Sequence, residues 1–445
     1  MASDLLSIGR SGAQAARVAL DVTAQNIANA SSEGYVRRSA RMAEVSSTGG
    51  FGRIGDVSLS GVRLDAVVRN ADLFRQAEVR RTGADAARAS AEVAGLENTE
   101  AAIEQSGVYD AMVKFEGSLQ QLVGNPTSDS LRANVIEDAR TLVGTFNIAS
   151  KALDSAGSGL RFEATDGVNQ VNTLAAQLAQ VNLRLARASD ASSDQTALLD
   201  QRDSLLQQLS SYTDVTTSVA VDNTVSVRIG GSSGPQLVQG GTAESLTMAT
   251  AADGTISFSV GGTGVALVGG SQAGKAQALT KLAAIHTNLD TIAKSVIDTV
   301  NAAQAAGVNL NGTTGQAMFG GTTAATMSLA LTSGAGIATA PAGAAANSRD
   351  ATNLNALRTA LSNNDPAKAL DALLFDISGT VAGRKVTRDA LQTIANTASV
   401  SLQAQAGVDL DQEAVNLVRY QQAFQASGKV MQTAKDIFDT LLAIR

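Results

Sequence analysis

The sequence predicts a mainly α-helical protein with a nested architecture, in which a terminal helical coiled-coil domain encloses a long-helix bundle domain and a small β insertion. Three observations favour this class. Only four of the 445 residues are proline, so long helices can run without interruption. Small and apolar residues recur every three or four positions through most of the chain. Glycine and alternating apolar residues gather in one central segment.

The first expected element is a helix over residues 4–30. Its small and apolar stripe consists of Leu5, Ile8, Gly12, Ala16, Leu20, Thr23, Ile27 and Ala30. The helix should end in the polar turn at residues 31–34, where Gly34 is suited to the left-handed conformation of a C-terminal cap. Residues 56–68 then alternate between apolar and polar side chains and predict one or two short strands, broken at Gly61.

A series of helices is expected next, up to Tyr212, where the character of the chain changes. These helices cover residues 70–105, 108–123, 127–154, 165–188 and 194–210. Residues 125–128 interrupt the pattern with Pro126, and Thr127 or Ser128 is suited to cap the helix that follows.

The central segment, residues 213–271, is rich in glycine and contains two hairpin patterns, so we expect a compact β insertion there. Helix resumes at residues 273–306. Residues 307–350 are rich in Gly, Ala, Thr and Asn, which predicts loops with weak strand signals near residues 327–331. A short helix follows at 353–361. A longer one is expected to open at Pro366 and to run to about residue 405.

The last helix, after a break at residues 407–411, has an apolar stripe that repeats about every 3.5 residues, the period of a coiled-coil seam. The stripe consists of Ala414, Leu417, Tyr420, Phe424, Ser427, Met431, Ala434, Phe438 and Leu441. Because each terminal helix is amphipathic, neither can bury its face alone, and we expect the two chain ends to pair. Two separate helices packed on the body are the alternative.

Paired ends imply nested domains with three parts. Residues 1–55 and 400–445 form the domain of paired terminal helices. Residues 56–212 and 272–399 form the helical bundle with its short strands, and residues 213–271 form the β-rich outer insertion.

Composition and charge exclude several classes of function. Cysteine is absent, which excludes disulfide scaffolds, cysteine-based metal sites and thiol catalysis, and a single histidine, His286, excludes a multi-histidine metal site. The net charge of −7 argues against a general nucleic-acid binder. The N-terminus lacks the pattern of a signal peptide, and no apolar run reaches the about 18 residues that span a membrane.

Several motifs resemble chemical sites, but each lacks an essential part. Residues 269–276 approach a phosphate-binding loop, yet Ala276 stands where Mg²⁺ needs a hydroxyl. Residues 230–234 match a nucleophile elbow, but Pro235 follows where a helix should begin. The calcium-loop start at residues 309–312 lacks its later carboxylates. We therefore expect no enzyme and no cofactor.

Two charged groups also need an interpretation. Asp200, Arg202 and Asp203 could suggest an acid–base cluster, but on a helix they are better interpreted as a solvated or inter-helix ion-pair face. Arg37, Arg38 and the nearby Arg41 form a small basic patch beside Tyr35, with too little aromatic support for nucleic-acid binding.

Both chain ends carry recognisable sequence motifs. The sequence AQNIANA at residues 24–30, followed by Gly34–Tyr35, resembles the N-terminal signature of bacterial flagellar rod, hook and hook-associated proteins. VDLDQEAVNLV at residues 408–418 resembles the C-terminal signature of the same family, and RYQQAFQAS at 419–427 is closer to its hook-associated junction proteins than to its rod or hook proteins. Internal segments at 198–209, 269–275 and 289–319 point the same way. The chain is short for the family, with one small insertion where longer members carry larger outer domains.

The resemblance implies a structural protein at the junction between flagellar hook and filament, extracellular, and exported through the flagellar type III apparatus without a cleaved signal. It implies as partners the flagellar hook protein, the second hook–filament junction protein, further copies of the chain in a ring or helical assembly, and a cytoplasmic export chaperone at the C-terminal helix. The terminal helices would then form the tube. We expect the assembly seam at Leu5, Ile8, Leu20, Ile27, Asn26, Asn29, Gly34, Tyr35, Leu417, Tyr420, Phe424, Met431, Phe438 and Leu441.

Three alternatives remain open from the sequence. A hook or rod subunit would belong to the same class. A soluble nucleotide-binding protein would rest on the loop at residues 269–276. A secreted adhesin would need a cleaved signal or an anchor. No nucleic-acid binding and no membrane insertion are expected.

Overall fold

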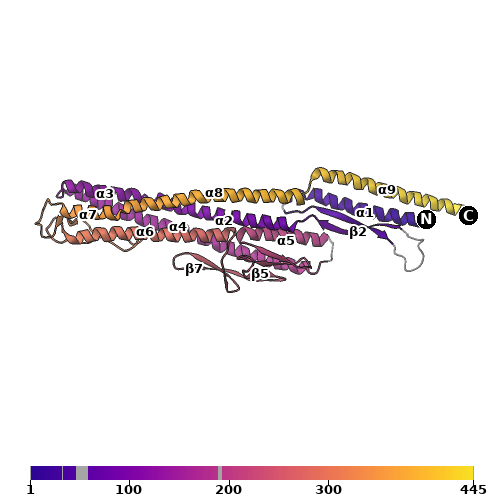
Figure 1. Ribbon diagram of the computed structural model, residues 1–445, viewed down its shortest axis with the longest axis horizontal. Coiled ribbons are helices and arrows are strands. Elements are labelled where there is room, and N and C mark those ends of the chain that lie inside the picture. The colour runs from indigo at the N-terminus through magenta and orange to yellow at the C-terminus, as the bar shows by residue number, and fades with distance from the viewer. Residues whose placement is uncertain (1, 33, 47–58, 189–192, 444–445) are drawn as a thin grey trace. The chain divides into compact units, whose positions relative to one another are not determined.

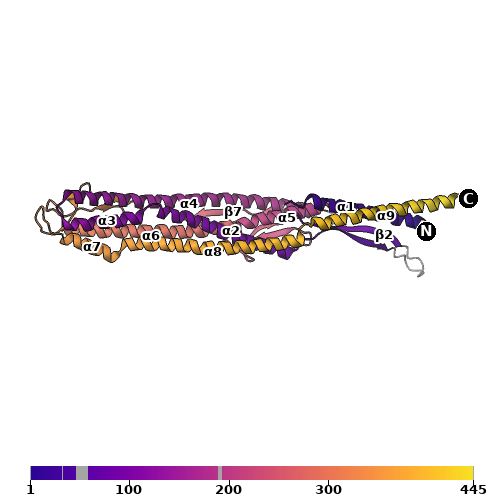
Figure 2. The same ribbon diagram turned by 90° about the horizontal axis from the view of Figure 1, so that it is seen from above.

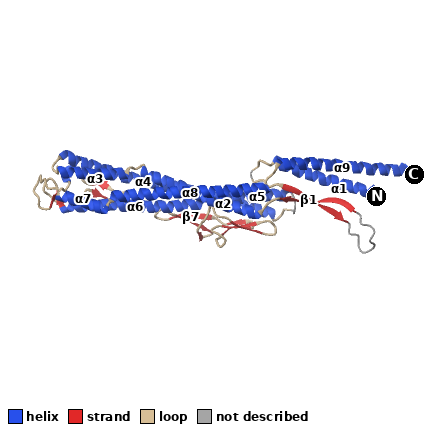
Figure 3. Ribbon diagram, turned by 45° about the horizontal axis from the view of Figure 1, so that its top comes forward, coloured by secondary structure: helices blue, strands red, loops and turns tan. Residues whose placement is uncertain are grey.

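The computed structural model describes residues 2–32, 34–46, 59–188 and 193–443, and it is mainly α-helical, as the sequence predicts (Figure 3). Its helices are α1 (Ala2–Ala28), α2 (Leu73–Glu104), α3 (Val108–Gly124), α4 (Asp129–Leu185), α5 (Ser193–Tyr212), α6 (Gly270–Ala306), α7 (Thr352–Asn364), α8 (Pro366–Ala406) and α9 (Leu410–Ala443).

The strands are short except for one long hairpin, and they form small antiparallel sheets. They are β1 (Arg38–Ser46), β2 (Leu59–Arg69), β3 (Thr216–Val219), β4 (Val225–Arg228), β5 (Gln236–Gln239), β6 (Thr242–Ala243), β7 (Leu246–Thr250), β8 (Ile256–Val260), β9 (Thr263–Val265), β10 (Gly307–Val308), β11 (Phe319–Gly320), β12 (Ser328–Leu329) and β13 (Ala340–Pro341). The segment expected as one β insertion holds two separate sheets, β3-β4-β5-β6 and β7-β8-β9.

The chain divides into two compact units. The terminal unit comprises residues 1–84, 171–246 and 392–445, and the bundle unit comprises residues 85–170 and 247–391. Helices α2, α4 and α8 contribute to both. The domain boundaries expected from the sequence stay predictions.

In the terminal unit, α1 lies against α9, and the β1–β2 hairpin packs beside α1 (Figure 1). The hairpin pairs Arg38 with Arg69 at its open end. The sheet β3-β4-β5-β6 is attached to the C-terminal part of α4 through Asn182, whose side-chain amide donates to the carbonyls of Val225 and Gly240 at 2.8 Å each. The side-chain oxygen of Asn182 accepts from the backbone amide of Val225 at 2.9 Å.

The bundle unit contains a core of large apolar side chains from α2, α3, α4, α6, α7 and α8. Phe115 and Phe319 meet edge to face, with their ring centroids 5.8 Å apart. Residues 307–350 are attached to this core by polar side chains: the buried Arg132 donates to the carbonyls of Gly334 and Ile337 at 3.0 and 2.9 Å. These residues therefore carry short strands and fixed turns in addition to the loops expected from their composition.

Helix α4 corrects the expectation of two helices, at 127–154 and 165–188, because it runs unbroken through the gap between them. Gly157 and Gly159 weaken the helical pattern there. Leu153, Leu160 and Ala164 nevertheless stay buried at helical spacing, so packing overrides local propensity.

Candidate assembly interface

The terminal helices α1 and α9 pack antiparallel, because residues near the start of α1 meet the second half of α9. A Cβ atom placed on Gly9 would lie 2.7 Å from Cγ of Met431, and one on Gly12 would lie 2.8 Å from Oγ of Ser427. At the other end of the pair, the side-chain amide of Asn26 donates to Glu413 Oε2 at 3.2 Å. Glycine at position 9 therefore permits the close approach of the two helices.

The buried face of α1 consists of small and β-branched residues and lies about one position away from the stripe expected in its sequence. Its buried members are Gly9, Ala15, Ala16, Ala19, Val22, Thr23 and Asn26. Leu5, Ile8 and Ile27 are exposed at this helix's margin, by 36–39%, and Leu20 is half-buried. The larger apolar side chains of α1 thus contribute little to its packing on α9.

The face of α9 that meets α1 follows the expected stripe only in part, because Ala414 is exposed and the aromatic residues Phe424 and Phe438 are partly exposed. Leu417, Tyr420 and Met431 are half-buried, and Ala434 is buried. Phe424 and Phe438 are 45% and 55% exposed. The side chain of Leu441 lies outside the described residues.

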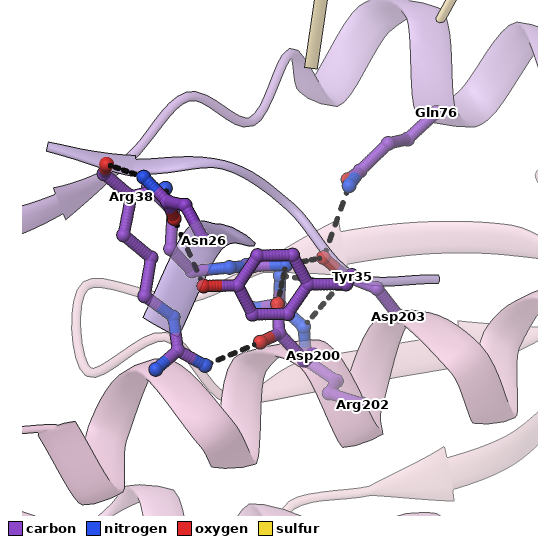
Figure 4. Close-up of polar contacts among 8 residues, drawn as sticks. Asn26, Tyr35, Arg38, Gln76, Asp200, Arg202 and Asp203 are labelled. Carbon is purple, nitrogen blue, oxygen red and sulfur yellow. Dashed lines mark hydrogen bonds and ion pairs between the residues drawn. The ribbon is translucent and has the colours of Figure 1, made fainter. Parts of the chain in front are cut away.

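Asn26 is the polar centre of the paired ends, and all the hydrogen-bonding groups of its side chain are used. Figure 4 shows its contacts with Arg38 and Tyr35. Its Nδ2 donates to the carbonyl of Arg38 at 2.8 Å and to Glu413. Its Oδ1 accepts from the backbone amide of Arg38 at 3.0 Å and from the hydroxyl of Tyr35 at 2.9 Å. One buried side chain thus connects α1 to α9 and to the start of the hairpin, and both its amide nitrogen and its amide oxygen are satisfied.

Asn29 and Gly34 have local roles in the same turn. The amide of Asn29 donates to the carbonyl of Gln25 within the last turn of α1 at 2.9 Å. Gly34 adopts a left-handed backbone, with φ of 77°, as expected. It lies beyond the end of α1, however, in the turn that leads to Tyr35, so it does not itself cap the helix.

Glu413 and Arg37 form an ion pair between the first turn of α9 and the segment before β1. Arg37 Nε donates to Glu413 Oε1 at 2.6 Å, and the Glu413 side chain is only 1% exposed. The backbone amide of Arg37 also donates to the carbonyl of Ala406 at 2.9 Å. The start of α9 is thereby fixed to the entry of the hairpin by side-chain and backbone contacts.

A second, largely buried ion cluster joins the hairpin to α5. Arg38 on β1 and its strand partner Arg69 on β2 both contact Asp200 at 2.7 Å. Arg69 also contacts Asp203 at 2.9 Å, and Arg202 contacts the other oxygen of Asp203 at 2.7 Å. Gln76 on α2 donates to Asp203 at 3.1 Å. Figure 4 shows these side chains converging from the hairpin, α2 and α5.

Burial and neighbouring charges shift the pKa values of groups in and beside this cluster. Burial tends to raise the pKa of the Asp203 carboxyl, but the guanidinium groups of Arg202 and Arg69 outweigh it and lower that pKa. Burial lowers the pKa of the nearby Arg80. Burial raises the pKa of the Tyr35 hydroxyl, and Arg38, which stacks 5.1 Å from the centre of its ring, partly opposes that rise. The carboxylate of Asp203 is thus held in its charged form.

Sequence reasoning found the charged residues of this region but not their partners. The triad at 200–203 was expected to be solvated or to pair between helices, whereas the structure pairs its carboxylates with Arg38, a member of the expected basic patch, and with Arg69, which was not part of it. Glu413 was overlooked as a site residue. The available signal for this pairing was charge complementarity. An arginine-rich turn and separated acidic residues flank the terminal signatures, and groups of opposite charge can pair.

Residues of the motifs that only partly resemble chemical sites make contacts within the fold. Lys275, in the near-phosphate-binding loop, donates to the carbonyl of Glu163 at 3.0 Å. His286 lies 3.3 Å from Ser150 Oγ and 3.5 Å from both Asp154 and Asp290. Across the described part of the chain, no group of three or more His, Cys, Asp or Glu side chains is arranged to hold a metal ion. Within the same residues, every helix is too short or too polar to cross a membrane.

Comparison with known families matches the segments that the structure brings together. The family model for the flagellar hook-associated protein FlgK helical domain matches residues 93–319, which is more than half of the chain. The model for the flagella basal body rod protein matches residues 6–35, and that for the C-terminal part of the flagellar basal body rod FlgEFG protein matches residues 403–444. These two terminal matches contain Asn26 and Glu413, which contact each other.

Similar individual proteins carry the same description. The chain is 28% identical to flagellar hook-associated protein 1 of Bacillus subtilis over 240 residues, covering 50% of this chain and 47% of that protein. It is 30% identical to flagellar hook-associated protein 1 of Escherichia coli over 249 residues, covering 55% and 44%. The solved flagellar hook junction protein FlgK of Burkholderia pseudomallei aligns with a TM-score of 0.49 at 25% identity, covering 55% and 46%. The chain thus spans about half the length of the curated relatives it matches.

A match to a hook-associated helical domain, flanked by rod-type matches at both chain ends, places the chain in the class of flagellar rod and hook-associated proteins. Within that class, the chain belongs to the flagellar hook-associated protein FlgK family.

Proposed function

We propose that this chain is a structural component of the bacterial flagellum that joins the hook to the filament, and that its copies assemble through α1 and α9. The relatives named flagellar hook-associated protein 1 and the terminal rod-type matches support this role. The proposal assigns no catalytic step to the chain and requires no cofactor, no nucleic acid and no membrane insertion.

The observation that carries the proposal is the exposure of large apolar side chains on both terminal helices. They include Leu5, Leu6, Ile8 and Ile27 on α1 and Val415, Val418, Phe424, Ile437 and Phe438 on α9, each at least 36% exposed. Burying apolar surface contributes about 25 cal/mol per Å², so these side chains favour contacts with neighbouring copies. Exposed large apolar side chains gathered on two paired helices are typical of an interaction site.

We divide the residues of the expected seam into two groups according to their contacts and exposure. Asn26, Asn29, Gly34 and Tyr35 shape the chain's own helix pair and hairpin, while Leu5, Ile8, Ile27, Phe424 and Phe438 remain available to other copies. Leu20, Leu417, Tyr420 and Met431 lie between these two groups, being half-buried. We assign the intermolecular seam to the exposed group, with Leu441 as the expected extension toward the C-terminus.

The proposed partners are further copies of the chain, the flagellar hook protein on one side and the second hook–filament junction protein on the other. A cytoplasmic export chaperone would cover the C-terminal helix before export through the type III apparatus, and the mature protein would lie outside the cell in the flagellum. Covering Phe424 and Phe438 before assembly would also prevent premature association of α9.

A flagellar hook or rod subunit is the second candidate, because the models that match the two chain ends are those of basal body rod proteins. The two candidates predict different phenotypes in a deletion strain. Loss of a junction protein leaves complete hooks without filaments and releases filament subunits into the medium, whereas loss of a hook or rod subunit leaves no complete hook.

Replacement of the exposed aromatics of α9 tests the proposed seam. We expect Phe424→Ala combined with Phe438→Ala to be secreted normally but absent from isolated flagella, so that cells secrete filament subunits without building filaments. Gln422→Ala combined with Gln432→Ala, at two exposed polar residues of the same helix, is the matched control and should incorporate normally. Secretion is measured separately from incorporation because the chaperone would bind the same helix. Full-length filaments that contain the secreted double variant would show that these aromatics do not form the seam.

A further inference from the structure

The buried ion cluster between the hairpin and α5 contains more positive than negative groups. Its charged members are Arg38, Arg69, Arg202, Asp200 and Asp203, and their side chains are 4–18% exposed. Three guanidinium groups therefore share two carboxylates. Because a guanidinium group keeps its proton in a protein, deprotonation cannot remove this surplus of one positive charge.

Arg80 on α2 adds a second positive charge beside the cluster. The start of α2 lies next to α5 (Figure 2), where Gln76 contacts Asp203. Arg80 is 7% exposed, and the charges of Asp203 and Arg202 both act on the pKa of its guanidinium group. Both oxygens of the Asp203 carboxylate already accept hydrogen bonds, one from Arg202 and the other from Arg69. The cluster together with Arg80 thus holds two more positive than negative charges.

Several guanidinium N–H groups of this region lack an acceptor among the described residues. Within that part of the chain, Arg80 donates one hydrogen bond, to Thr217 Oγ1 on β3 at 3.4 Å, near the far limit of the range. A guanidinium group has five N–H donors, so most of those of Arg80 are open. The Nε atoms of Arg38 and Arg69 are also buried without a partner there. Buried charges and donors without acceptors are unfavourable, so the region needs an additional acceptor that carries negative charge.

A doubly charged oxyanion meets both needs. Planar guanidinium groups bind oxyanions through two parallel N–H···O hydrogen bonds, and a dianion matches the surplus of two positive charges. The hydroxyl of Thr217 accepts from Arg80 and keeps its own proton for donation to such an ion. Arg80 retains a small exposed fraction, which gives a free ion access, whereas its burial leaves little surface for a side chain of another protein.

We propose that Arg80 and Thr217 bind a doubly charged oxyanion, such as sulfate or hydrogen phosphate, beside the buried ion cluster. The ion joins α2 to β3 and reduces the repulsion between Arg80 and Arg202 on α5. Because the ion binds only the folded arrangement, it stabilises the terminal unit by mass action. The proposal concerns the free chain and does not depend on the proposed role in the flagellum.

Replacement of chloride by sulfate at constant ionic strength tests this site in the purified chain. Hydrogen exchange is followed at the hairpin and α5, with α3 and α6 of the bundle unit as an internal reference for the general stabilisation that sulfate gives to proteins. Exchange at the hairpin and α5 should slow along a saturating curve, by about tenfold when sulfate reaches ten times its Kd. Exchange at α3 and α6 should change only gradually.

Two variants assign the effect to Arg80. Arg80→Gln removes the open donors and should abolish the saturating response, while the variant stays folded in chloride because it loses an uncompensated buried charge. Arg81→Gln removes the same charge from the exposed neighbouring residue on α2 and should keep the response. Isothermal titration calorimetry of sulfate into the natural chain should give one site per chain, and this measurement does not depend on either variant.

Several results would overturn the proposal. A gradual slowing of equal size in both units would show only the general effect of sulfate. A saturating response that persists in Arg80→Gln would place the site elsewhere, and loss of the response in both arginine variants would show a dependence on overall charge. Absence of binding heat, together with an exchange response that does not saturate, would exclude an oxyanion site in this chain.

Discussion

The core of the bundle unit and the paired terminal helices differ in the size of the side chains that they bury. In the bundle unit, Phe115, Leu142 and Phe146 are fully buried. In the terminal pair, the buried positions of α1 are held mainly by glycine and alanine, while Phe424 and Phe438 on α9 stay exposed. The bundle unit therefore derives stability from its own core, whereas the two phenylalanines of α9 add little to the packing of the terminal helices.

This difference has a consequence for the free chain. An α-helix pair that buries mostly alanine gains little, because each buried methylene contributes only about 0.8 kcal/mol. The contact between Asn26 and Glu413 specifies where the ends meet, and the cluster at Asp200 and Asp203 fixes the hairpin on α5. Assembly would then supply the apolar burial that the single chain lacks.

We expect the largest difference in unfolding free energy between replacement of an aromatic residue in the core and of one on the proposed seam. Phe115→Ala should lower the free energy of unfolding of the bundle unit by about 3–5 kcal/mol, because it leaves a cavity in a closed core. Phe424→Ala should leave that quantity unchanged in the free chain, since its side chain is 45% exposed. Urea unfolding followed by circular dichroism measures both. Similar losses in the two variants would contradict the contrast between the two regions.

The buried ion cluster should show the next largest effect, confined to the terminal unit. Asp203→Ala removes an acceptor of Arg202, Arg69 and Gln76 and leaves the buried guanidinium of Arg202 without a carboxylate partner. Breaking a buried pair in this way costs about 3–5 kcal/mol, an upper range here because Asp200 still contacts Arg69. Hydrogen exchange should increase at the hairpin and α5, while exchange at α3 and α6 stays unchanged. Asp436→Ala, an exposed residue of α9, serves as the control.

The carboxylate of Asp203 should also make the stability of the terminal unit depend on pH. Because the folded pKa of Asp203 is lowered, its stabilising contribution is complete above the unfolded value of about 3.9 and is lost as pH falls through the folded pKa. We expect protease sensitivity of the hairpin to rise below about pH 4. Asp203→Asn should make that sensitivity less dependent on pH over the same range, and an unchanged acid profile in this variant would contradict the assignment.

The sequence predicted the helices well where apolar spacing is regular, and it failed where packing overrides local preference. The break expected near Gly157 and Gly159 does not occur, because Leu153 and Leu160 keep α4 attached to the core. The pairing of the chain ends was predictable because both terminal stripes need a partner. Their register was not predictable, since it depends on Gly9 meeting Met431 and on Asn26 meeting Glu413, contacts between residues far apart in sequence.

We expect the smallest changes in stability when a glycine inside a helix is replaced by alanine, with one such glycine in each region. Gly9→Ala places a methyl group 2.7 Å from Met431 Cγ and 3.2 Å from the carbonyl oxygen of Ser427. The Met431 side chain can move but the backbone of α9 cannot yield as easily, so we expect a loss of about 1 kcal/mol, at the low end of overpacking costs. Gly117→Ala in α3 meets nothing within 4 Å, so the helix should gain about 0.5–1 kcal/mol from alanine. Limited proteolysis of the terminal helices and thermal unfolding of the bundle unit measure the two changes separately. Opposite signs would support a tight α1–α9 contact, whereas stabilisation by both substitutions would show that α1 and α9 do not pack closely in the free chain.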